Sequence, residues 1–502
     1  MAVDGAQPVT VRTGAVTGSM SLRFQAFRDA GAAPWVGNLL EYGAGWDLPL
    51  PRRPYAKFRQ RKLPTEETRF VDNEVRRLLA AGAIESGTAK IKCPVFCVPK
   101  KGPDKYRLIH DLREANKYFQ PQPFTLEGLR ALPRVLQPGY RAITVDLKSA
   151  FHQVLVAPRL RPYLAFEWRG ATYLWKVLPF GFTHSPACMQ GVAQVLADAL
   201  TRQGLPASIY LDDCIVGVPP GYPDPMATVR RTFESFGAIL AQDKGVDTPS
   251  TSVPFLGFLV VNEDAHGYIS VPTRKAANLR RTLRLILRRR EVPRWQLASV
   301  VGSIAALRSA CPSASGFIRA AYQAIGAART RRTRVPLDRR TRGELRWWIS
   351  ALESPMCAFF RHPAPSVTAT TDASRLGWGV TLNPGAEISP GSMTTAQGRW
   401  RRSQAERLSM GALELLAVKY AVRRVPPGTL TRPTVLRLWC DSSNALAALT
   451  RGSAARTCYA IARSTLRLLH RRHVVLVASW ISTHDNIWAD RLSRFQQLPT
   501  RC

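Results

Sequence analysis

The stretch Ile209-Tyr210-Leu211-Asp212-Asp213-Cys214-Ile215-Val216 places two adjacent carboxylates between runs of aromatic, aliphatic and β-branched residues. Such runs are typical of strands, so the stretch predicts a hairpin with its acids at the turn. Neighbouring Asp side chains repel each other when both are ionised, and a divalent cation would relieve that repulsion. An ordinary Asx turn between two strands is the alternative, and the pair of acids alone does not exclude it.

A third carboxylate follows another predicted strand. Residues 141–146 alternate as a strand does and residues 148–153 look like a helix start, which places Asp146 at the strand's end. Oxygen ligands on two adjacent strand ends suit hard, octahedral Mg²⁺, which binds carboxylates together with the phosphates of its substrate. We therefore expect Asp146, Asp212 and Asp213 to converge on Mg²⁺, or Mn²⁺ in its place.

The composition predicts a polyanionic partner. The 502 residues carry 71 Lys and Arg against 35 Asp and Glu, a formal net charge of +36 at pH 7. This favours nucleic acid over an anionic membrane, because no amphipathic anchor or lipidation motif is evident. Residues 274–346 alone hold 19 Lys and Arg against 3 acids, including the run Arg288, Arg289 and Arg290. We expect this segment to contact a phosphate backbone.

Several function classes are excluded by what the sequence lacks. Its nine Cys have no His at the spacing of a zinc site, so we interpret them as reduced, buried thiols. Residues 1–20 have no apolar core of a signal peptide, and no run of about 18 apolar residues occurs. The predicted location is the cytoplasm, the nucleus or both, with no membrane segment.

The acids and the motifs between them resemble the palm of reverse transcriptases. Asp146, then Leu178-Pro179-Phe180-Gly181-Phe182 with Ser185-Pro186, then Tyr210-Leu211-Asp212-Asp213, have that family's order and spacing. Residues 98–116 resemble its fingers and Phe255-Leu256-Gly257-Phe258 its primer grip. The resemblance covers most of residues 67–260. It implies an RNA template, a DNA primer and dNTPs as partners.

The resemblance also implies which residues bind the nucleotide. Arg107, with Lys100 or Lys101, would hold the triphosphate, since Arg suits bidentate phosphate contact and Lys acts as a point charge. The hairpin that carries them is shorter than in some relatives, so the choice of lysine stays open. Residues 233–244 resemble the helix and lysine that follow the catalytic hairpin, so Lys244 would protonate the leaving pyrophosphate, with a plain surface lysine as the alternative.

Two phenylalanines complete the implied nucleotide site. Phe151 would fill the space that a 2′-hydroxyl needs, and Phe180 stands where retroviral enzymes carry Gln and retrotransposon enzymes commonly carry Phe. The latter favours a retrotransposon origin. Residues 301–321 and Trp347-Trp348 further resemble the connection of DIRS-type elements, and a gypsy-type origin is the alternative.

A second set of acids follows in the order Asp372, Glu414, Asp441 and Asp490, each at a predicted strand end or on a predicted helix. Singly, each would be a surface acid. As an ordered set after a polymerase they resemble ribonuclease H, which implies two Mg²⁺ ions that activate water against the RNA of an RNA–DNA hybrid. Relatives often carry a His where this chain has Trp480, and whether the nearby His484 replaces it stays open.

The expected fold is α/β of the α+β kind, a right-hand polymerase with fingers, palm and thumb, followed by a ribonuclease H-like mixed sheet. We predict a mobile N-terminal arm over 1–60, fingers and palm over 61–265, a basic thumb and connection over 266–360, and the nuclease over 361–502. No integrase or recombinase motif is present, so integration is expected to need a separate protein. The alternative function is an inactive, domesticated or decayed nucleic-acid-binding relic, which the full set of seven acids disfavours.

Overall fold

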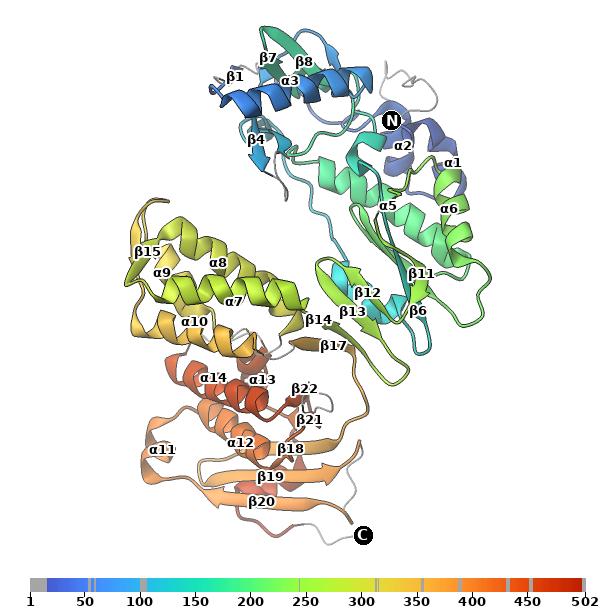
Figure 1. The fold of residues 1–502 in the computed structure, drawn as a ribbon. Coiled ribbons are helices and arrows are strands. Elements are labelled where there is room, and N and C mark those ends of the chain that lie inside the picture. The colour runs from blue at the N-terminus through green and yellow to red at the C-terminus, as the bar shows by residue number, and fades with distance from the viewer. Residues whose placement is uncertain are drawn as a thin grey trace. The chain divides into compact units, whose positions relative to one another are not determined.

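The computed structural model describes residues 16–52, 56–57, 60–99, 106–242, 244–311, 314, 316–353, 356–386, 391–429, 434–450 and 455–498. The chain divides into two compact units, Met1–Leu256 and Gly257–Cys502 (Figure 1). None of the helices in the described ranges combines the length and the apolar character that crossing a lipid bilayer requires.

The centre of the first unit is an antiparallel sheet of order β11-β6-β10-β9. Its strands are β6 (Arg141–Asp146), β9 (Ala207–Tyr210), β10 (Asp213–Val218) and β11 (Val246–Ser250). The β-branched and aliphatic residues of β6 and β10 are buried almost throughout, which explains why these two strands lie inside the sheet. The hairpin predicted around Asp212 and the strand predicted to end at Asp146 are both confirmed.

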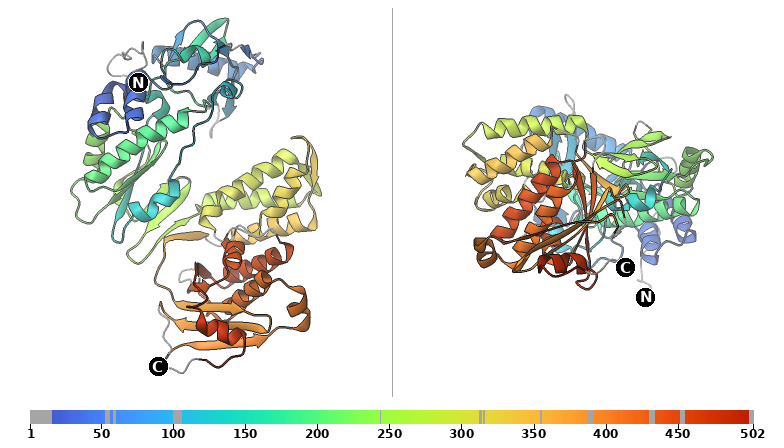
Figure 2. Two further views of the ribbon diagram at one scale, coloured as in Figure 1. Left: turned by 180° about the vertical axis from the view of Figure 1, so that it is seen from behind. Right: turned by 90° about the horizontal axis from the view of Figure 1, so that it is seen from below.

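Two helices cover this palm sheet (Figures 1 and 2). α5 (Ser185–Arg202) begins at the predicted Ser185-Pro186 and packs on β9. α6 (Pro225–Ser235) has Asp224 as its N-cap, whose carboxylate accepts from the Ala227 N–H. The helix predicted between Phe233 and Lys244 is wrong, because Gly237 adopts a φ of 69° just after α6 and ends it.

The fingers contain a five-stranded sheet of order β1-β3-β7-β8-β2 and a separate hairpin. Helix α3 (Thr65–Ala80) packs beside them with Val71, Val75 and Leu78 buried, as its spacing predicts, whereas Leu79 is exposed. The strands are β1 (Ala56–Lys57), β2 (Ile84–Ser86), β3 (Ile91–Lys92), β7 (Ala165–Trp168) and β8 (Ala171–Trp175), and the hairpin pairs β4 (Val95–Pro99) with β5 (Tyr106–His110).

Residues 16–52 do not form the mobile arm that the sequence predicted. They fold into α1 (Phe24–Asp29), α2 (Pro34–Tyr42) and a short 3₁₀ turn. Phe27 is fully buried, and its ring packs edge-on against Phe236 with centroids 4.7 Å apart. This segment is therefore part of the palm's core. Residues 1–15 of the predicted arm lie outside the described residues.

The second unit begins with three antiparallel strands and a group of helices. The strands are β13 (Phe258–Asn262), β14 (Gly267–Ser270) and β17 (Cys357–Arg361). The helices are α7 (Thr273–Leu287), α8 (Arg294–Ala306), α9 (Arg319–Gly326) and α10 (Arg339–Ala351), with a small ladder between β15 (Glu291–Pro293) and β16 (Arg334–Pro336).

The second unit ends in the predicted mixed sheet, of order β20-β19-β18-β21-β22. β18 pairs parallel with β21 and antiparallel with β19, and β21 pairs parallel with β22. The strands are β18 (Val367–Ala373), β19 (Gly377–Pro384), β20 (Thr394–Arg399), β21 (Thr434–Cys440) and β22 (Val474–Trp480). The helices are α11 (Arg402–Arg407), α12 (Met410–Arg424), α13 (Ser443–Thr450), α14 (Arg456–Arg471) and α15 (Ile487–Ser493).

Helices α12 and α15 cover opposite faces of this sheet. Val380 of β19 packs in a cluster with Leu413 of α12. A Cβ placed on the preceding residue, Gly379, would lie 2.3 Å from the Ala489 carbonyl oxygen of α15. Because successive residues of a strand face opposite sides, the two helices enclose β19 between them. Gly379 is thus needed for the close approach of α15.

A buried polar link joins α10 to α14. The Glu344 carboxylate is 1% exposed and accepts from the Ala320 and Ala321 N–H groups at 3.0 and 3.1 Å and from the Tyr459 hydroxyl at 3.1 Å. Beside it, Trp347 stacks on Phe317 with ring centroids 3.8 Å apart. These contacts fix the basic helical segment against the mixed sheet's own helix.

Candidate polymerase and nuclease centres

The three palm acids gather at one end of the palm sheet. Asp213 begins β10 and lies in register with Asp146, the last residue of β6. Asp212 lies in the turn before it, and its carbonyl oxygen accepts from the Leu147 N–H at 3.0 Å. Asp146 is 8% exposed, Asp213 is half-buried and Asp212 is exposed. The backbone of two neighbouring strands thus brings the three predicted acids together.

Mutual repulsion shapes the electrostatics of this end. Partial removal from water raises the pKa of Asp212, and the charge of Asp146 raises it further, while Lys244 and Arg107 act in the opposite direction. The pKa of Asp213 is raised by the same kind of desolvation and by both other acids. The Lys244 ammonium lies 2.7 Å from Asp146 Oδ2 with most of its side chain in solvent. Lys244 therefore offsets only part of the cluster's negative charge, and these oxygen-only donors fit hard divalent cations.

Gln190 of α5 holds the turn that carries Asp212, a role that we did not assign from the sequence. Its side-chain amide donates to the Ile209 carbonyl at 3.0 Å, and its Oε1 accepts from the Leu211 N–H at 3.2 Å. Leu211 adopts a left-handed φ of 59°, which costs a residue with a Cβ about 1–2 kcal/mol. Gln190 thereby fixes the strained backbone directly before Asp212. A polar residue on the otherwise apolar face of α5 was the signal in the sequence.

The two predicted nucleotide-site phenylalanines contact each other. The rings of Phe151 and Phe180 meet edge-to-face with centroids 4.8 Å apart. Phe151 is 8% exposed and Phe180 is 47% exposed, so the buried ring of Phe151 supports the exposed ring of Phe180 at the surface. Asn116 holds the loop of Phe180 by donating to the Gly181 carbonyl at 2.8 Å and accepting from the Thr183 N–H at 3.0 Å.

The predicted phosphate-binding side chains are only partly described. Arg107 is exposed on β5, and its charge acts on Asp212. Lys100 and Lys101 lie outside the described residues. Lys244 lies in the loop after α6 and is paired with Asp146, so the structure gives it a contact that the sequence did not predict.

The second set of acids converges at the ends of the parallel strands. Asp372 lies on β18 and Asp441 directly follows β21, while α12 supplies Glu414 and α15 supplies Asp490. The ligand atoms of Glu414, Asp441 and the neighbouring Cys440 all lie within 4.8 Å of one another. The Ser493 hydroxyl donates to Asp372, and the Arg494 guanidinium lies 2.8 Å from Asp490.

Burial and mutual repulsion also act on this second cluster. Burial raises the pKa of Glu414 to about 9, with the charges of Asp372 and Asp441 adding to the effect. Burial raises the pKa of Asp372 to about 6, against the Ser493 hydrogen bond. The Oε2 atom of Glu414 is buried without a hydrogen-bond partner. A divalent cation would supply the missing partner and relieve the repulsion, so the acids fit the predicted Mg²⁺.

Trp480 is the last residue of β22, and His484, whose role the sequence left open, lies in the loop that follows. Trp480 is 58% exposed, and its indole N–H donates to the Asp441 carbonyl at 3.0 Å. The Thr483 hydroxyl donates to the Asp441 carboxylate at 3.0 Å. His484 is exposed next to Thr483. Trp480 therefore serves to fix the backbone of Asp441, which an imidazole at its place would not do in the same way.

The predicted basic run lies at the end of α7. Arg288, Arg289 and Arg290 are all exposed. Their backbone is held by Arg342, whose guanidinium donates to the Leu287 carbonyl at 2.8 Å and also to the Arg289 carbonyl. Arg342 thus satisfies the carbonyl groups at the helix end, and the three exposed arginines remain at the surface, where the Arg289 guanidinium donates to the Gln296 side chain at 3.3 Å.

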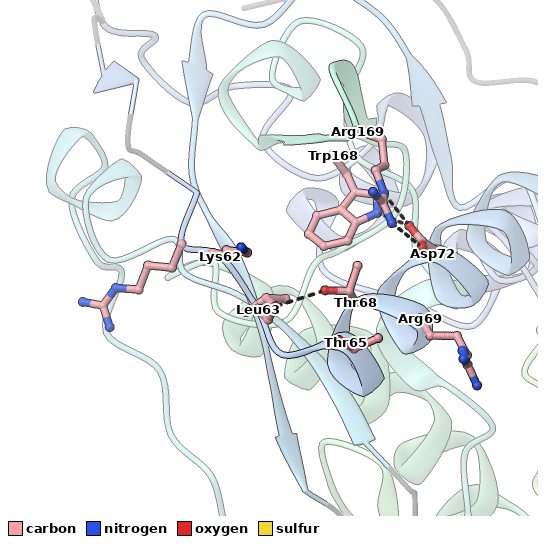
Figure 3. A pocket seen from close by; sticks show the side chains of 9 residues that line it. Lys62, Leu63, Thr65, Thr68, Arg69, Asp72, Trp168 and Arg169 are labelled. Atoms are coloured by element: carbon pink, nitrogen blue, oxygen red, sulfur yellow. Dashed lines mark hydrogen bonds and ion pairs between the residues drawn. The ribbon is translucent and has the colours of Figure 1, made fainter.

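Two pockets of the first unit lie apart from the predicted acids. One of about 500 Å³ is bordered by α3 and the turn of β7 and β8, where Asp72 accepts from the Trp168 indole and the Arg169 guanidinium (Figure 3). The other, of about 690 Å³, lies between α2 and α5. None of the seven predicted acids lines either pocket, so the chemistry is expected at the open strand ends.

The region that carries the first of these centres is similar to known proteins. Residues 98–260 match the family model described as reverse transcriptase (RNA-dependent DNA polymerase). The Pol-related polyprotein of the mouse intracisternal A-particle MIA14 is 32% identical over 193 residues, which cover 36% of this chain and 22% of that relative. The Pol polyprotein of the gypsy transposon of Drosophila melanogaster is 31% identical over 153 residues, covering 29% of this chain and 14% of that relative. The chain thus spans less than a quarter of these relatives.

Solved structures show the same fold over nearly the whole chain. The foamy viral protease-reverse transcriptase in complex with an RNA/DNA hybrid has a TM-score of 0.54 and 17% identity, covering 99% of this chain and 66% of that one. The same viral protein in complex with double-stranded DNA gives a TM-score of 0.54 at 17% identity, covering 94% and 98%. The predicted fold class is confirmed. The matched residues 98–260 include Asp146, Asp212 and Asp213, so this part of the chain is similar to the reverse transcriptases of retroelements.

Proposed function

We propose that the chain is an RNA-directed DNA polymerase that also hydrolyses the RNA strand of RNA–DNA hybrids, in the replication of a retrotransposon. Its partners would be an RNA template, a DNA primer, the hybrid they form and dNTPs. The observation that carries the proposal is the convergence of Asp146, Asp212 and Asp213 at the end of the palm sheet, inside the matched region. The second convergence, around Glu414, supports the ribonuclease.

In each centre the carboxylates would hold two divalent cations, Mg²⁺ or Mn²⁺, which when bound activate the attacking oxygen and stabilise the leaving group. The chain's own side chains would position the remaining groups of the centre. Gln190 fixes the turn that carries Asp212, and Arg107 is placed to pair with phosphate oxygens. Lys244 would leave Asp146 when a cation arrives and then become free to donate a proton to pyrophosphate.

The direct test is primer extension on poly(rA) with oligo(dT) and Mg²⁺. We expect DNA synthesis that depends on the divalent cation and is stopped by its chelation. A second assay follows loss of labelled RNA from a hybrid under the same conditions. Binding of template-primer with neither activity would instead favour the relic.

We expect Phe151→Val to admit ribonucleotides markedly better while deoxynucleotide incorporation falls only modestly. The ring is buried against the exposed Phe180, where a side chain can reject the 2′-hydroxyl that distinguishes RNA precursors from DNA precursors. Single-nucleotide incorporation with dCTP and CTP measures the ratio. Phe233→Val, at a fully buried ring of α6, is the matched control. It should cost about 2–4 kcal/mol of stability and leave the ratio unchanged. An unchanged ratio for Phe151→Val removes it from the site.

Replacing Arg288, Arg289 and Arg290 together by Gln should weaken template-primer binding equally for all sequences. Phosphate contacts carry no sequence information, and each lost contact flattens the dependence of log affinity on log salt by about 0.9 for duplex DNA. Fluorescence anisotropy across a salt series gives this slope. The control removes the same charge from Arg202, Arg230 and Arg231, which are exposed on α5 and α6. If log affinity depends on log salt with the same slope in the wild type and in both triple variants, then Arg288, Arg289 and Arg290 face solvent.

A further inference from the structure

Cys440 lies inside the second cluster of acids, although a site for a hard cation such as Mg²⁺ needs no thiol ligand. It is the last residue of β21, fully buried, and precedes Asp441. Its sulfur lies within 4.8 Å of carboxylate oxygens of both Glu414 and Asp441. Across the described parts of the chain, no other three ligand atoms of His, Cys, Asp and Glu gather this closely.

An independent observation shows that the cluster lacks a cationic partner. Glu414 is 7% exposed, and its Oε2 atom has no hydrogen-bond partner. A buried carboxylate oxygen without a partner carries the full cost of its desolvation, which a bound cation removes. The unpaired oxygen belongs to the same side chain that lies beside the Cys440 sulfur.

The donor set distinguishes between metals. Zinc binds thiolate sulfur at about 2.3 Å and carboxylate oxygen at about 2.0–2.2 Å, so two such ligands of a tetrahedral ion lie roughly 3.6 Å apart. Small rotations of the three side chains would reach that spacing. Mg²⁺ is a hard ion that takes oxygen ligands, whereas thiolates select soft and borderline ions.

We propose that Glu414, Cys440 and Asp441 form a binding site for a thiophilic divalent cation such as Zn²⁺, which displaces Mg²⁺ and stops hydrolysis of the RNA strand. The inference that it inhibits rests on the proposed ribonuclease function. On binding, the cation replaces the proton of the Cys440 thiol and the proton that the buried Glu414 carboxyl carries, and both protons pass to solvent. Because two of the ligands are acids of the proposed Mg²⁺ set, both ions cannot be held together.

Cadmium binding tests the site without any need for activity. Cd²⁺ is titrated into the full-length protein while the ultraviolet charge-transfer absorption of cadmium thiolate is recorded. We expect Cys440→Ser to lose part of this absorption. Cys214→Ser is the matched control, because Cys214 is equally buried and directly follows the palm acid Asp213. It should retain the wild-type signal. Equal signals in wild type and Cys440→Ser overturn the proposal.

A second variant keeps the test decisive if Cys440→Ser folds poorly. Glu414→Gln leaves the thiol in place and removes one charged ligand, so at least about tenfold more Cd²⁺ should be needed for half the absorption change. Unchanged Cd²⁺ affinity in this variant also overturns the site.

Zinc inhibition then tests the functional consequence. Hybrid degradation is measured against Zn²⁺ at fixed Mg²⁺, with each variant normalised to its own zinc-free rate. Cys440→Ser should need at least about tenfold more Zn²⁺ for half inhibition, while zinc inhibition of primer extension stays the same. Equal zinc sensitivity of hybrid degradation overturns the inhibitory role. If the wild type degrades no hybrid at all, the proposed ribonuclease fails, while the cadmium titration still decides the metal site.

Discussion

Replacing Asp212 by Asn should reduce DNA synthesis by at least about a thousandfold, which corresponds to about 4 kcal/mol of the activation barrier. The substitution keeps the shape of the side chain and removes its charge at the turn where Asp146 and Asp213 converge. It leaves the strands and the exposed basic groups in place, so affinity for a template-primer duplex should stay within about threefold, because phosphate contacts supply most of it. Primer extension and duplex binding are measured on the same preparation.

The control for this experiment is Asp247→Asn, which removes an exposed charge from β11 of the same sheet, a strand whose register pairs Val246 with Thr144 and Ser250 with Ala142 and not with any of the three acids. It should retain synthesis near the wild-type rate. If Asp212→Asn keeps extension within tenfold of wild type, Asp212 does not hold the cation. If duplex binding falls together with synthesis, the residue supports the fold rather than the chemistry.

Asp372→Asn should abolish degradation of RNA in a hybrid and spare polymerisation. Its carboxylate lies on β18 among the other acids of the mixed sheet, and Ser493 orients it. Removing one ligand of a two-metal centre is expected to cost about a thousandfold or more in rate. The measurement follows labelled RNA in a preformed hybrid beside primer extension by the same variant.

The control for this prediction is the reciprocal experiment, in which the palm variant is tested for hybrid degradation. Asp212→Asn should keep hybrid degradation, and Glu406→Gln, at an exposed acid of α11 paired with Arg402, should keep both activities. Equal loss of both activities in Asp372→Asn would argue against separate centres. If the wild type shows neither activity, only the relic remains, since an inert binding protein has no rate to lose.

The strand ends that carry the acids could be predicted because local patterns determine them. β-branched runs around Asp212 and Asp213, and the alternation before Asp146, are properties of a few adjacent residues. The same holds for β18, β21 and the start of α15 at Ile487. The fold class followed from the order of these motifs, since each has a fixed place in one architecture.

Long-range contacts could not be predicted in this way. Gln190 meets the catalytic turn across 21 positions of sequence, and no pattern on α5 marks its partner. Residues 16–52 were predicted as mobile from their composition, but Phe27 is buried by Phe236, more than 200 positions away. The helix predicted to reach Lys244 ends early because Gly237 approaches the Ser19 carbonyl, where an added Cβ would lie 2.4 Å from the oxygen. In each case tertiary packing overrode local propensity.

The link between Glu344 and Tyr459 has a consequence for how the second unit unfolds. Separating α10 from α14 would leave the Glu344 carboxylate buried without the Tyr459 hydroxyl and would expose the stacked Phe317 and Trp347. Each of these losses costs about 1–3 kcal/mol, a large part of the stability of a typical domain. We therefore expect the basic helical segment and the mixed sheet to unfold as one cooperative unit, with a shared melting transition and shared protection of their amide hydrogens from exchange. The boundary predicted near residue 361 should then not separate two thermodynamic domains, in keeping with the single compact unit that spans it.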